Sequence, residues 1–390
     1  MHEVPLNSGF LASKFIKLSQ NIDTHLLIWG SKDDVRKFLE QYKLPKEYKK
    51  RIHNVNVNAI GAIKAICLLI EVLFTSKAFR SYLWTSKGSF IEKLKFAVTY
   101  FPAIKYKWDI IHFEFGTIAQ RATRLKEIVS AKLSVSFRGY DLNYAGLNDE
   151  SYYGKVWDEF DGFHFLGNDL KQRAISRGYK GAKNEVLIPP AIDTEYFTAQ
   201  PFEKETNIFV ITSVGRLVWK KAYEYAIQAM TILKNSGVIF QYNIIGDGDA
   251  RQQLEYLINE MGLNNEIKLL GSMSTASVKD ELNRSNLFLH PAVSEGFSNA
   301  VLEAQAMGLP VICTDADGLS ENIVDTVTGF IVPKWNAAAI AEKLIWCNNN
   351  KDRLNEMGNA GVIRARTYFQ IEDQIEEFIN YYRRLAIEQD

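Results

Sequence analysis

Short runs of β-branched and aromatic residues alternate with helical segments from residue 207 to about residue 365. The runs that read as strands are IFVITSVG, FQYNIIG, EIKLLG, LFLHPA and PVICTD, and helical patterns such as AYEYAIQAMTILKNSG and ARQQLEYLINEMG separate them. Strands that alternate with helices in this way form a parallel sheet with helices on both faces. The alternation therefore predicts one complete doubly wound α/β domain in this half of the chain.

The first half of the chain repeats the same order less regularly, with strand-like runs THLLIWG, IIHFEFG, KLSVSFRG, GFHFLG and EVLIPP. The aperiodic stretch AIDTEYFTAQPFEKETN joins the halves and marks a boundary. We predict one Rossmann-like domain over 1–200 and a second Rossmann-like domain over 201–370. Residues 371–390 form a helix that either braces the first domain or caps the second. Because ligands of open α/β sheets bind beyond the carboxyl ends of strands, the functional residues should follow the strands.

Charge is unevenly distributed although the formal net charge is zero. Residues 1–200 hold 29 Lys and Arg against 21 Asp and Glu, whereas residues 201–390 hold 17 against 25. Most of the positive excess lies between Lys43 and Lys107, interleaved with aromatic residues. This mixture favours contact with an anionic membrane, and a solvated basic face over an aromatic core is the alternative. No nucleic-acid-binding module accompanies the charge, so no nucleic acid partner is expected.

Targeting signals and redox chemistry give a second set of exclusions. The three cysteines stand far apart in apolar segments, which fits reduced thiols better than disulfide bonds or a zinc site. Residues 1–15 lack the basic start and unbroken apolar stretch of a signal peptide. The longest apolar run, 59–74, is shorter than the roughly 20 residues of a membrane span. We therefore predict a cytoplasmic protein, and leave open its association with the inner face of the plasma membrane.

The strongest functional pattern is PAVSEGFSNAVLEAQAMGLPV over residues 291–311, which reads as a strand end, a polar loop and a helix that begins near Ser298. A helix start offers unpaired N–H groups and the positive end of the helix dipole, a suitable site for a diphosphate. Glu295 precedes the helix and Glu303 follows eight residues later. At 1.5 Å rise per helical residue the two carboxylates are about 10 Å apart, which matches the opposite ends of a nucleotide-sugar diphosphate. For two isolated glutamates, a capping residue and a solvated residue would be the more ordinary reading.

Glu295-Gly-Phe with Glu303-Ala, the Pro310-Val strand and the later Gly318-Leu-Ser-Glu321-Asn resemble glycosyltransferase family 4, the glycosyl transferases group 1. The resemblance runs from about residue 110 to the C-terminus. It implies a GT-B fold, two Rossmann-like doubly wound domains facing a central cleft, with residues 1–200 as the acceptor domain and residues 201–370 as the nucleotide-sugar donor domain. It also implies transfer of a sugar from a nucleotide sugar, such as a UDP- or GDP-sugar, with retention of configuration and without a metal. The acceptor is then a glycan or a lipid-linked glycan in capsule, exopolysaccharide or lipopolysaccharide assembly.

A second motif, Ser213-Val-Gly215-Arg216-Leu-Val-Trp-Lys-Lys221, places two cations five positions apart after a strand. Two fixed cations stabilise the charge that grows on a leaving diphosphate, and the family spacing selects Lys221 over Lys220. The resemblance implies that Glu295 binds the donor sugar and Glu303 the ribose. The predicted catalytic residues are Glu295, Arg216, Lys221, His112, Arg138 and Asp141. The predicted donor-binding residues are Gly215, Gly246, Asp247, Met273, Gly296, Phe297, Ser298, Asn299, Ala300 and Glu303.

Two patterns suggest other chemistry and are weaker. Gly246-Asp247-Gly248 begins a dinucleotide-binding fingerprint, but position 251 is Arg where a third glycine is needed, which argues against a dehydrogenase. The Asp-x-Asp patterns at 247–249 and 315–317 imitate a metal site. Both fall at strand-to-helix turns, so we interpret them as turn and cap residues and predict no metal.

The first half departs from the family pattern. Arg138 stands where the family commonly has histidine, and an arginine cannot act as a neutral acceptor or a proton shuttle. His112, at the end of another predicted strand, is either a polar partner at the cleft or a structural histidine. At three other positions a glycine of the family is replaced, namely by Ala191, Ala222 and Asp317.

The start of the sequence resembles the loop that follows a first strand, so we expect that strand to be missing. Either another segment fills its place, or the sequence begins inside a longer reading frame. Together with Arg138, this leaves a non-catalytic nucleotide-sugar-binding or scaffold protein on a GT-B fold as the alternative. A GT-B phosphorylase or a sucrose-type synthase is a third interpretation, which predicts a soluble acceptor.

Overall fold

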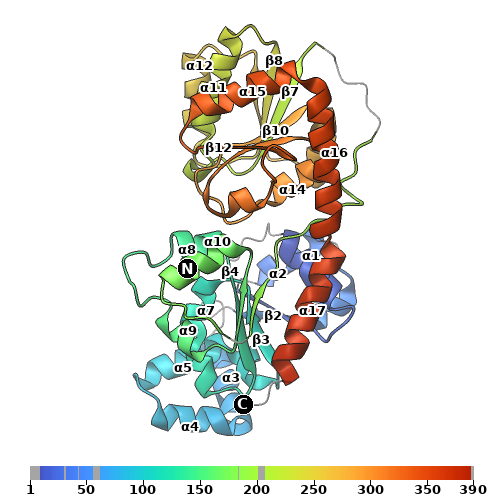
Figure 1. Cartoon of the computed structure of the whole chain (residues 1–390). Helices are drawn as coiled ribbons and strands as arrows, with labels where there is room; N and C mark the ends of the chain where they lie inside the picture. Colours follow the sequence, from blue (N-terminus) through green and yellow to red (C-terminus); the bar gives the residue numbers. More distant parts are fainter. Residues whose placement is uncertain are drawn as a thin grey trace.

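The computed structural model describes residues 9–29, 32–42, 44–55, 62–182, 184–200 and 207–387. These residues form two α/β domains, one above the other in Figure 1. The chain crosses between the two domains twice. All paired strands are parallel in both domains. The predicted α/β class with parallel sheets is therefore confirmed.

The first domain is built around the sheet β3-β4-β5-β6, and β1 pairs with β2 in a separate two-stranded sheet. Its strands are β1 (Leu26–Trp29), β2 (Ile52–Val55), β3 (Ile110–Phe113), β4 (Lys132–Phe137), β5 (Gly162–Phe165) and β6 (Glu185–Leu187). Its longer helices are α1 (Gly9–Leu18), α2 (Lys32–Gln41), α3 (Ala62–Thr75), α4 (Lys77–Thr85), α5 (Phe90–Thr99), α7 (Gly116–Ala122) and α10 (Asn168–Ser176). Short helical segments are η1 (Lys46–Arg51), α6 (Phe101–Lys105), η2 (Thr123–Glu127), α8 (Gly139–Asn143) and α9 (Gly154–Glu159). Most of the segment interpreted as the loop after a missing first strand, residues 1–8, lies outside the described residues.

The second domain has a six-stranded sheet in the order β12-β11-β10-β7-β8-β9. Its strands are β7 (Phe209–Val214), β8 (Phe240–Ile245), β9 (Ile267–Gly271), β10 (Leu287–His290), β11 (Val311–Thr314) and β12 (Gly329–Val332). Its helical elements are η3 (Trp219–Lys221), α11 (Tyr223–Asn235), α12 (Arg251–Glu260), α13 (Thr275–Arg284), α14 (Asn299–Ala306), η4 (Asp317–Glu321), α15 (Ala337–Asn349) and α16 (Lys351–Tyr368). The chain builds outward from β7 to β9, returns to the other side of β7 at β10 and continues to β12. The strand order thus reverses between β7 and β10, where an open α/β sheet forms its ligand crevice.

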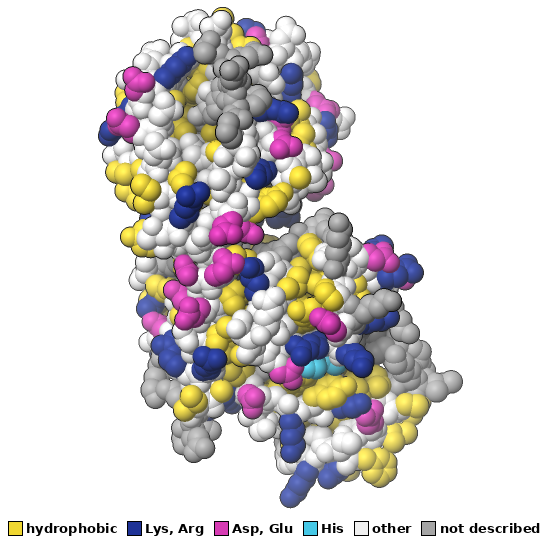
Figure 2. All heavy atoms as spheres, turned by 90° about the vertical axis from the view of Figure 1, so that its right-hand side faces the viewer, with side chains coloured by type: hydrophobic (Ala, Val, Ile, Leu, Met, Phe, Trp, Pro, Cys, Tyr) yellow, Lys and Arg dark blue, Asp and Glu magenta, His cyan; other side chains and the backbone are white. Residues whose placement is uncertain are grey.

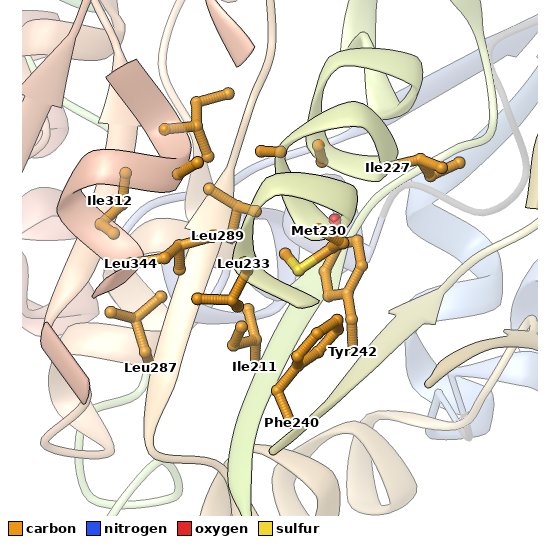
Figure 3. Close-up of a cluster of buried hydrophobic side chains, with 14 of the residues drawn as sticks. Ile211, Ile227, Met230, Leu233, Phe240, Tyr242, Leu287, Leu289, Ile312 and Leu344 are labelled. Carbon is orange, nitrogen blue, oxygen red and sulfur yellow. The ribbon is translucent and has the colours of Figure 1, made fainter. Parts of the chain in front are cut away.

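Helices cover both faces of this second sheet. On one face, Met230 and Leu233 of α11 pack onto Ile211, Leu289 and Ile312 of three neighbouring strands, as Figure 3 shows. All five side chains are fully buried. Burial of each such side chain contributes about 1.5–3 kcal/mol. The other face packs against α13, α14 and the end of α16. This core fixes the carboxyl ends of the strands and hence the loops that follow them.

The C-terminal helices connect the two domains. Ile192 pairs with the short link after α16: its N–H donates to the Phe369 carbonyl at 3.0 Å, and its carbonyl accepts from the Ile371 N–H at 3.1 Å. The last helix, α17 (Ile371–Ile387), then packs on the first domain, where Tyr381 Oη lies 2.6 Å from Ser134 Oγ. Figure 1 shows α16 beside the second domain and α17 beside the first. The predicted boundary at residue 200 adjoins residues 201–206, which lie outside the described residues.

Two of the three residues that replace family glycines have left-handed backbone conformations. Ala222 has φ 51° and Asp317 has φ 47°, whereas Ala191 is not in that region. A left-handed residue with a side chain costs roughly 1–2 kcal/mol, so both positions carry strain that glycine would avoid. Across the described part of the chain, every helix is too short or too polar to serve as a membrane span.

Candidate active site

A cavity of about 330 Å³ opens at the carboxyl ends of β7 and β10, where the strand order reverses. The residues that line it are Val214, Gly215, Arg216, Lys220, Lys221, Glu295, Phe297, Ser298, Asn299, Ala300 and Glu303. They come from the turn after β7, the loop after β10 and the first turns of α14. The two sequence motifs of this domain, about 80 positions apart along the chain, therefore meet in one cavity.

Four predicted donor-binding residues lie outside the lining of this cavity, namely Gly246, Asp247, Met273 and Gly296, the last of which contacts Gly139 of the first domain. Gly246 packs against the turn after β7, and a Cβ atom there would stand 2.0 Å from the Gly215 carbonyl oxygen, so only glycine fits. Asp247 accepts a hydrogen bond from the Gly248 N–H at 2.9 Å, and Met273 packs against the buried core below α14. These residues shape or support the turns around the cavity.

Glu295 forms the centre of a triad with Lys221 and His290. The Lys221 ammonium and the Glu295 carboxylate form an ion pair, and His290 Nε2 lies 3.4 Å from both Lys221 Nζ and Glu295 Oε2. Burial opposes ionisation of Glu295, but Lys221 and His290 outweigh it and hold its pKa well below the ordinary value. Burial and the Lys221 charge lower the pKa of His290 to about 4, so this ring is neutral at neutral pH. Glu295 is therefore a carboxylate, already paired with the cation beside it.

The start of α14 is presented to the cavity without a side-chain cap. Ser298 occupies the N-cap position, and no side chain accepts a hydrogen bond from the first turn there. The Ser298 backbone is fixed by Asn322, whose Oδ1 accepts from the Ser298 N–H and whose Nδ2 donates to the Ser298 carbonyl, both at 3.0 Å. N–H groups at a helix start, together with the helix dipole, favour an anion. The geometry suits a phosphate group between Glu295 and Glu303.

Glu303 lies one helical turn further along α14 and lines the far part of the cavity. Burial raises the pKa of its carboxyl group to about 7. Near neutral pH the group is thus partly protonated, and a ligand that donates hydrogen bonds to the carboxylate would favour the ionised form. A hydroxyl-bearing group such as ribose supplies such donors.

Lys220 also lines the cavity, although the sequence pattern favoured its neighbour Lys221. Its Nζ lies 5.7 Å from the centre of the Tyr144 ring, and burial lowers its pKa. Its backbone carbonyl accepts a hydrogen bond from the Val293 N–H at 2.9 Å, which fixes the turn after β7 against the loop after β10. The adjacent lysine was visible in the sequence, but only the short η3 turn brings both ammonium groups to one cavity. His290, the last residue of β10, was missed because a single histidine at a strand end carries no distinctive spacing.

The first domain holds Arg138 in a buried charge cluster. Arg138 Nη2 lies 2.7 Å from Glu114 Oε2, and Lys14 Nζ lies 2.7 Å from Glu114 Oε1. Burial opposes ionisation of Glu114, yet Lys14, His112 and Arg138 together hold its pKa well below the ordinary value. This cluster could not be predicted from sequence, because Lys14 and Glu114 are 100 positions apart.

His112 and Asp141 are placed in the interior of the first domain rather than in the wall of the cavity. His112 Nδ1 lies 3.0 Å from Ser134 Oγ and its Nε2 lies 2.8 Å from Ser136 Oγ, and burial lowers its pKa far below the ordinary value. Asp141 is fully buried, and its carboxylate accepts hydrogen bonds from the N–H groups of Thr117 and Arg138, both at 2.9 Å. Asp141 thereby ties the start of α7 to the loop that carries Arg138.

Gly139 brings the first domain against the loop of Glu295. A Cβ atom on Gly139 would stand 3.0 Å from the Gly296 backbone nitrogen, so the two backbones touch across the domain boundary. Within the described residues, no three His, Cys, Asp or Glu side chains converge in a way that could hold a metal ion.

Comparison with known proteins defines the class of the second domain. Residues 195–363 match the sequence family described as Glycosyl transferases group 1. The chain is 27% identical over 286 residues to the amylovoran biosynthesis glycosyltransferase AmsK of Erwinia amylovora, covering 71% of this chain and 70% of AmsK. It is 28% identical over 258 residues to the putative colanic acid biosynthesis glycosyltransferase WcaL of Escherichia coli, covering 62% of each chain. The second domain is thus a glycosyl transferases group 1 domain with glycosyltransferase homologues.

The arrangement of both domains also matches solved structures. The structure of Anabaena HepE in complex with UDP and glucose superposes with a TM-score of 0.72 at 15% identity, covering 95% of this chain and 94% of HepE. A glycosyltransferase from Rickettsia africae superposes with a TM-score of 0.70 at 18% identity, covering 98% of this chain and 96% of that one. At such identities the likeness concerns the fold, and it confirms the predicted GT-B architecture of two Rossmann-like domains.

Proposed function

We propose that this chain is a retaining glycosyltransferase that moves a sugar from a nucleotide diphosphate donor to a glycan or lipid-linked acceptor. The cavity between β7 and β10 carries the proposal, because cations, two carboxylates and an uncapped helix start all face it. A nucleotide sugar such as a UDP- or GDP-sugar has the complementary groups, an anionic diphosphate between two rings rich in hydroxyls. The similarity to AmsK and WcaL supports a role in capsule, exopolysaccharide or lipopolysaccharide assembly.

In this proposal Arg216, Lys221 and the start of α14 bind the diphosphate. During transfer, the bond between the anomeric carbon and the β-phosphate oxygen breaks, and its electron pair remains on that oxygen. The two cations stabilise the charge that develops there without themselves transferring a proton. Because they neutralise the diphosphate, the proposed reaction uses no metal ion.

Glu295 binds hydroxyl groups of the donor sugar, and Glu303 binds those of the ribose. The acceptor hydroxyl attacks the anomeric carbon on the face from which the diphosphate departs and gives its proton to the departing phosphate oxygen. Configuration is therefore retained, and no covalent enzyme intermediate is required. The ion pair between Lys221 and Glu295 must loosen for both groups to reach the donor, so donor binding exchanges one pair of polar contacts for two.

Thermal stabilisation by nucleotides tests the donor site directly. The purified protein is heated with UDP, GDP, ADP and the corresponding glucose derivatives, beside Lys221→Ala and Glu303→Ala. Lys268→Ala, which removes an exposed lysine from β9, is the matched control. We expect one nucleotide series to stabilise the wild type and the control but neither cavity variant. A folded protein that none of the nucleotides stabilises would refute the proposal. If a nucleotide sugar binds but a turnover assay detects no release of nucleotide from any donor, the result would favour the non-catalytic alternative.

We further propose that the acceptor is reached at the cytoplasmic face of an anionic membrane through α3, α4 and α5. This end of the first domain exposes Ile66, Ile70, Phe74, Trp84, Phe90 and Ile91. Exposed cations on α4, α5 and the turn between them accompany these side chains, namely Lys77, Arg80, Lys87 and Lys95. Figure 2 shows hydrophobic and basic side chains together at the lower end of the molecule, which carries these helices in Figure 1. Apolar side chains enter the lipid boundary while cations meet anionic headgroups. Each cation contributes about 1 kcal/mol to the free energy of membrane binding.

Flotation with phosphatidylglycerol and phosphatidylcholine vesicles tests this surface. Phe74 and Trp84 are 82% and 85% exposed, so the double variant Phe74→Ser/Trp84→Ser leaves the core intact. On the membrane both aromatic side chains would be buried in lipid. Their removal costs about 3 kcal/mol of binding free energy in total, which predicts roughly 100-fold weaker binding to phosphatidylglycerol vesicles. Ile239→Ser/Tyr256→Ser removes side chains of the second domain that are 67% and 65% exposed, and this control should bind like the wild type. Equal flotation of all three proteins would contradict the proposed surface.

A further inference from the structure

The carboxylate of Asp317 holds the loop that carries Glu295. Its Oδ2 accepts hydrogen bonds from the Ser294 hydroxyl and, at 3.2 Å, from the Glu295 backbone N–H. The Asp317 side chain is only 8% exposed, so these bonds are shielded from water. Asp317 therefore contacts the backbone of a residue to which the proposed function assigns the donor sugar.

The same carboxylate also binds two side chains of the first domain. Asn143 Nδ2, at the end of α8, lies 2.8 Å from Oδ2, and Arg173 Nη2, on α10, lies 2.8 Å from Oδ1. The Asp317 carboxylate thus accepts hydrogen bonds from four donors, two in each domain. Charge-assisted hydrogen bonds of this kind are about twice as strong as neutral ones.

A second carboxylate of η4 reaches the first domain close by. Glu321 accepts hydrogen bonds from the backbone N–H groups of Asn168 and Asp169 at 3.0 and 2.8 Å and so caps the start of α10. The short η4 segment therefore joins the domains at both of its ends. Its Asp317 end also contacts the backbone of Glu295 itself.

The backbone at Asp317 would favour a different residue. Its φ of 47° is strained for aspartate and unstrained for glycine, the residue found in the family pattern. A side chain at this position therefore costs stability that the contacts of its carboxylate must offset. Those contacts join the domain interface to the active-site loop.

We propose that Asp317 is a positioning residue that couples closure of the two domains to the placement of Glu295. In the closed arrangement, Asn143 and Arg173 hold the carboxylate in the orientation that also fixes Ser294 and the Glu295 N–H. When α8 and α10 move away, two of the four donors leave, and the carboxylate is free to turn from the loop. Glu295 is then held for catalysis only when the cleft is closed around both substrates. The inference rests on the proposed function for its kinetic consequence and on the contacts alone for its structural one.

The test replaces Asp317 by glycine, which the local backbone accepts, so the variant is expected to fold. Thr326→Gly is the matched control, because Thr326 also has a positive φ, 63°, but lies outside this network. Small-angle X-ray scattering of the full chain measures domain closure, and thermal unfolding of Asp317→Gly, Arg173→Ala and the double variant measures coupling. We expect a larger radius of gyration for Asp317→Gly and for the double variant but not for Thr326→Gly, and a loss of Tm in the double variant smaller than the sum of the two single losses.

Kinetics separate positioning from a purely structural role. With the nucleotide sugar identified by the thermal panel, Asp317→Gly should lower kcat roughly 10- to 100-fold while KM changes less than about 3-fold. Asp317→Asn, which keeps one acceptor oxygen, should recover part of that loss. Additive losses of Tm together with an unchanged radius of gyration, or an unchanged kcat, would overturn the inference. A wild type that turns over no nucleotide sugar would refute the proposed function, while scattering and coupling would still decide whether Asp317 joins the domains.

Discussion

Replacement of Glu303 by glutamine is expected to stabilise the folded protein at alkaline pH while weakening its nucleotide site. Burial raises the pKa of Glu303 to about 7 from its ordinary value of 4.5, so the folded protein binds this proton more tightly than the unfolded chain does. The free energy of unfolding therefore decreases as pH rises from about 4.5 to about 7, and it stays lower above that range. Glutamine cannot ionise and removes this loss.

The magnitude follows from the two pKa values. A rise from 4.5 to about 7 corresponds to about 3 kcal/mol. Because the carboxyl group borders the cavity and water reaches it there, we expect about 1–2 kcal/mol, or a Tm higher by roughly 3–6 °C at pH 8. At pH 4.5 the variant and the wild type should have nearly the same Tm.

Differential scanning calorimetry at pH 4.5, 6 and 8 checks this prediction, with Glu260→Gln on the exposed side of α12 as a control. A Tm difference between Glu303→Gln and wild type that is the same at pH 4.5 and pH 8 would refute the reasoning. A lower Tm for the variant at pH 8 would do the same.

The nucleotide affinity should depend on pH in the opposite sense. A carboxylate accepts hydrogen bonds from ribose hydroxyls better than the protonated acid does, so binding of UDP should release a proton from Glu303. Wild-type affinity for UDP is expected to increase between pH 5.5 and pH 7.5, as measured by titration calorimetry. The diphosphate also titrates in this range, but it does so equally with Glu303→Gln, so the difference between the two profiles reports Glu303 alone. Identical profiles would contradict the assignment of this residue to the ribose.

Other substitutions give independent predictions. Lys221→Met leaves the Glu295 carboxylate beside His290 without its cation. The free energy of unfolding, measured in urea, should decrease by about 1–3 kcal/mol, a moderate value because the pair is partly exposed. An unchanged free energy of unfolding would argue that the ion pair contributes little. Gly296→Ala places a Cβ atom 3.0 Å from Gly139 across the domain boundary and should reduce donor turnover about 10-fold, whereas Gly154→Ala, which meets nothing within 4 Å, should leave it unchanged. Equal turnover by these two variants would show that the domains do not need this close approach.

Much of the second domain could be predicted from sequence because its information is local. Strand-like runs, helical periodicity and the turn residues after each strand lie within a few positions of one another. The reversal of strand order then follows from packing rules, and it brings the Arg216 and Glu295 motifs to one crevice. The residues expected at the donor site therefore line it, with the exceptions of Gly246, Asp247, Met273 and Gly296, which surround it.

The first domain shows where local information ends. His112, Arg138 and Asp141 do follow or end strands, but their partners come from Ser134, Glu114 and Thr117. Their environments depend on burial, which the sequence does not specify for a polar side chain. Burial decides whether such a group meets substrate or satisfies a neighbour, because an unpaired polar group in the interior is costly.

The sequence by itself determined the α/β class, the division into two Rossmann-like halves and the chemical character of the cavity between β7 and β10. Tertiary structure alone decided which charges are paired: Lys221 with Glu295, Glu114 with Lys14 and Arg138, and Asp317 with both domains. The physical reason is that periodicity and turn chemistry act between near neighbours in the chain. Electrostatic pairing acts between neighbours in space, and residues as far apart in sequence as Asn143 and Asp317, 174 positions, become such neighbours only when the chain has folded.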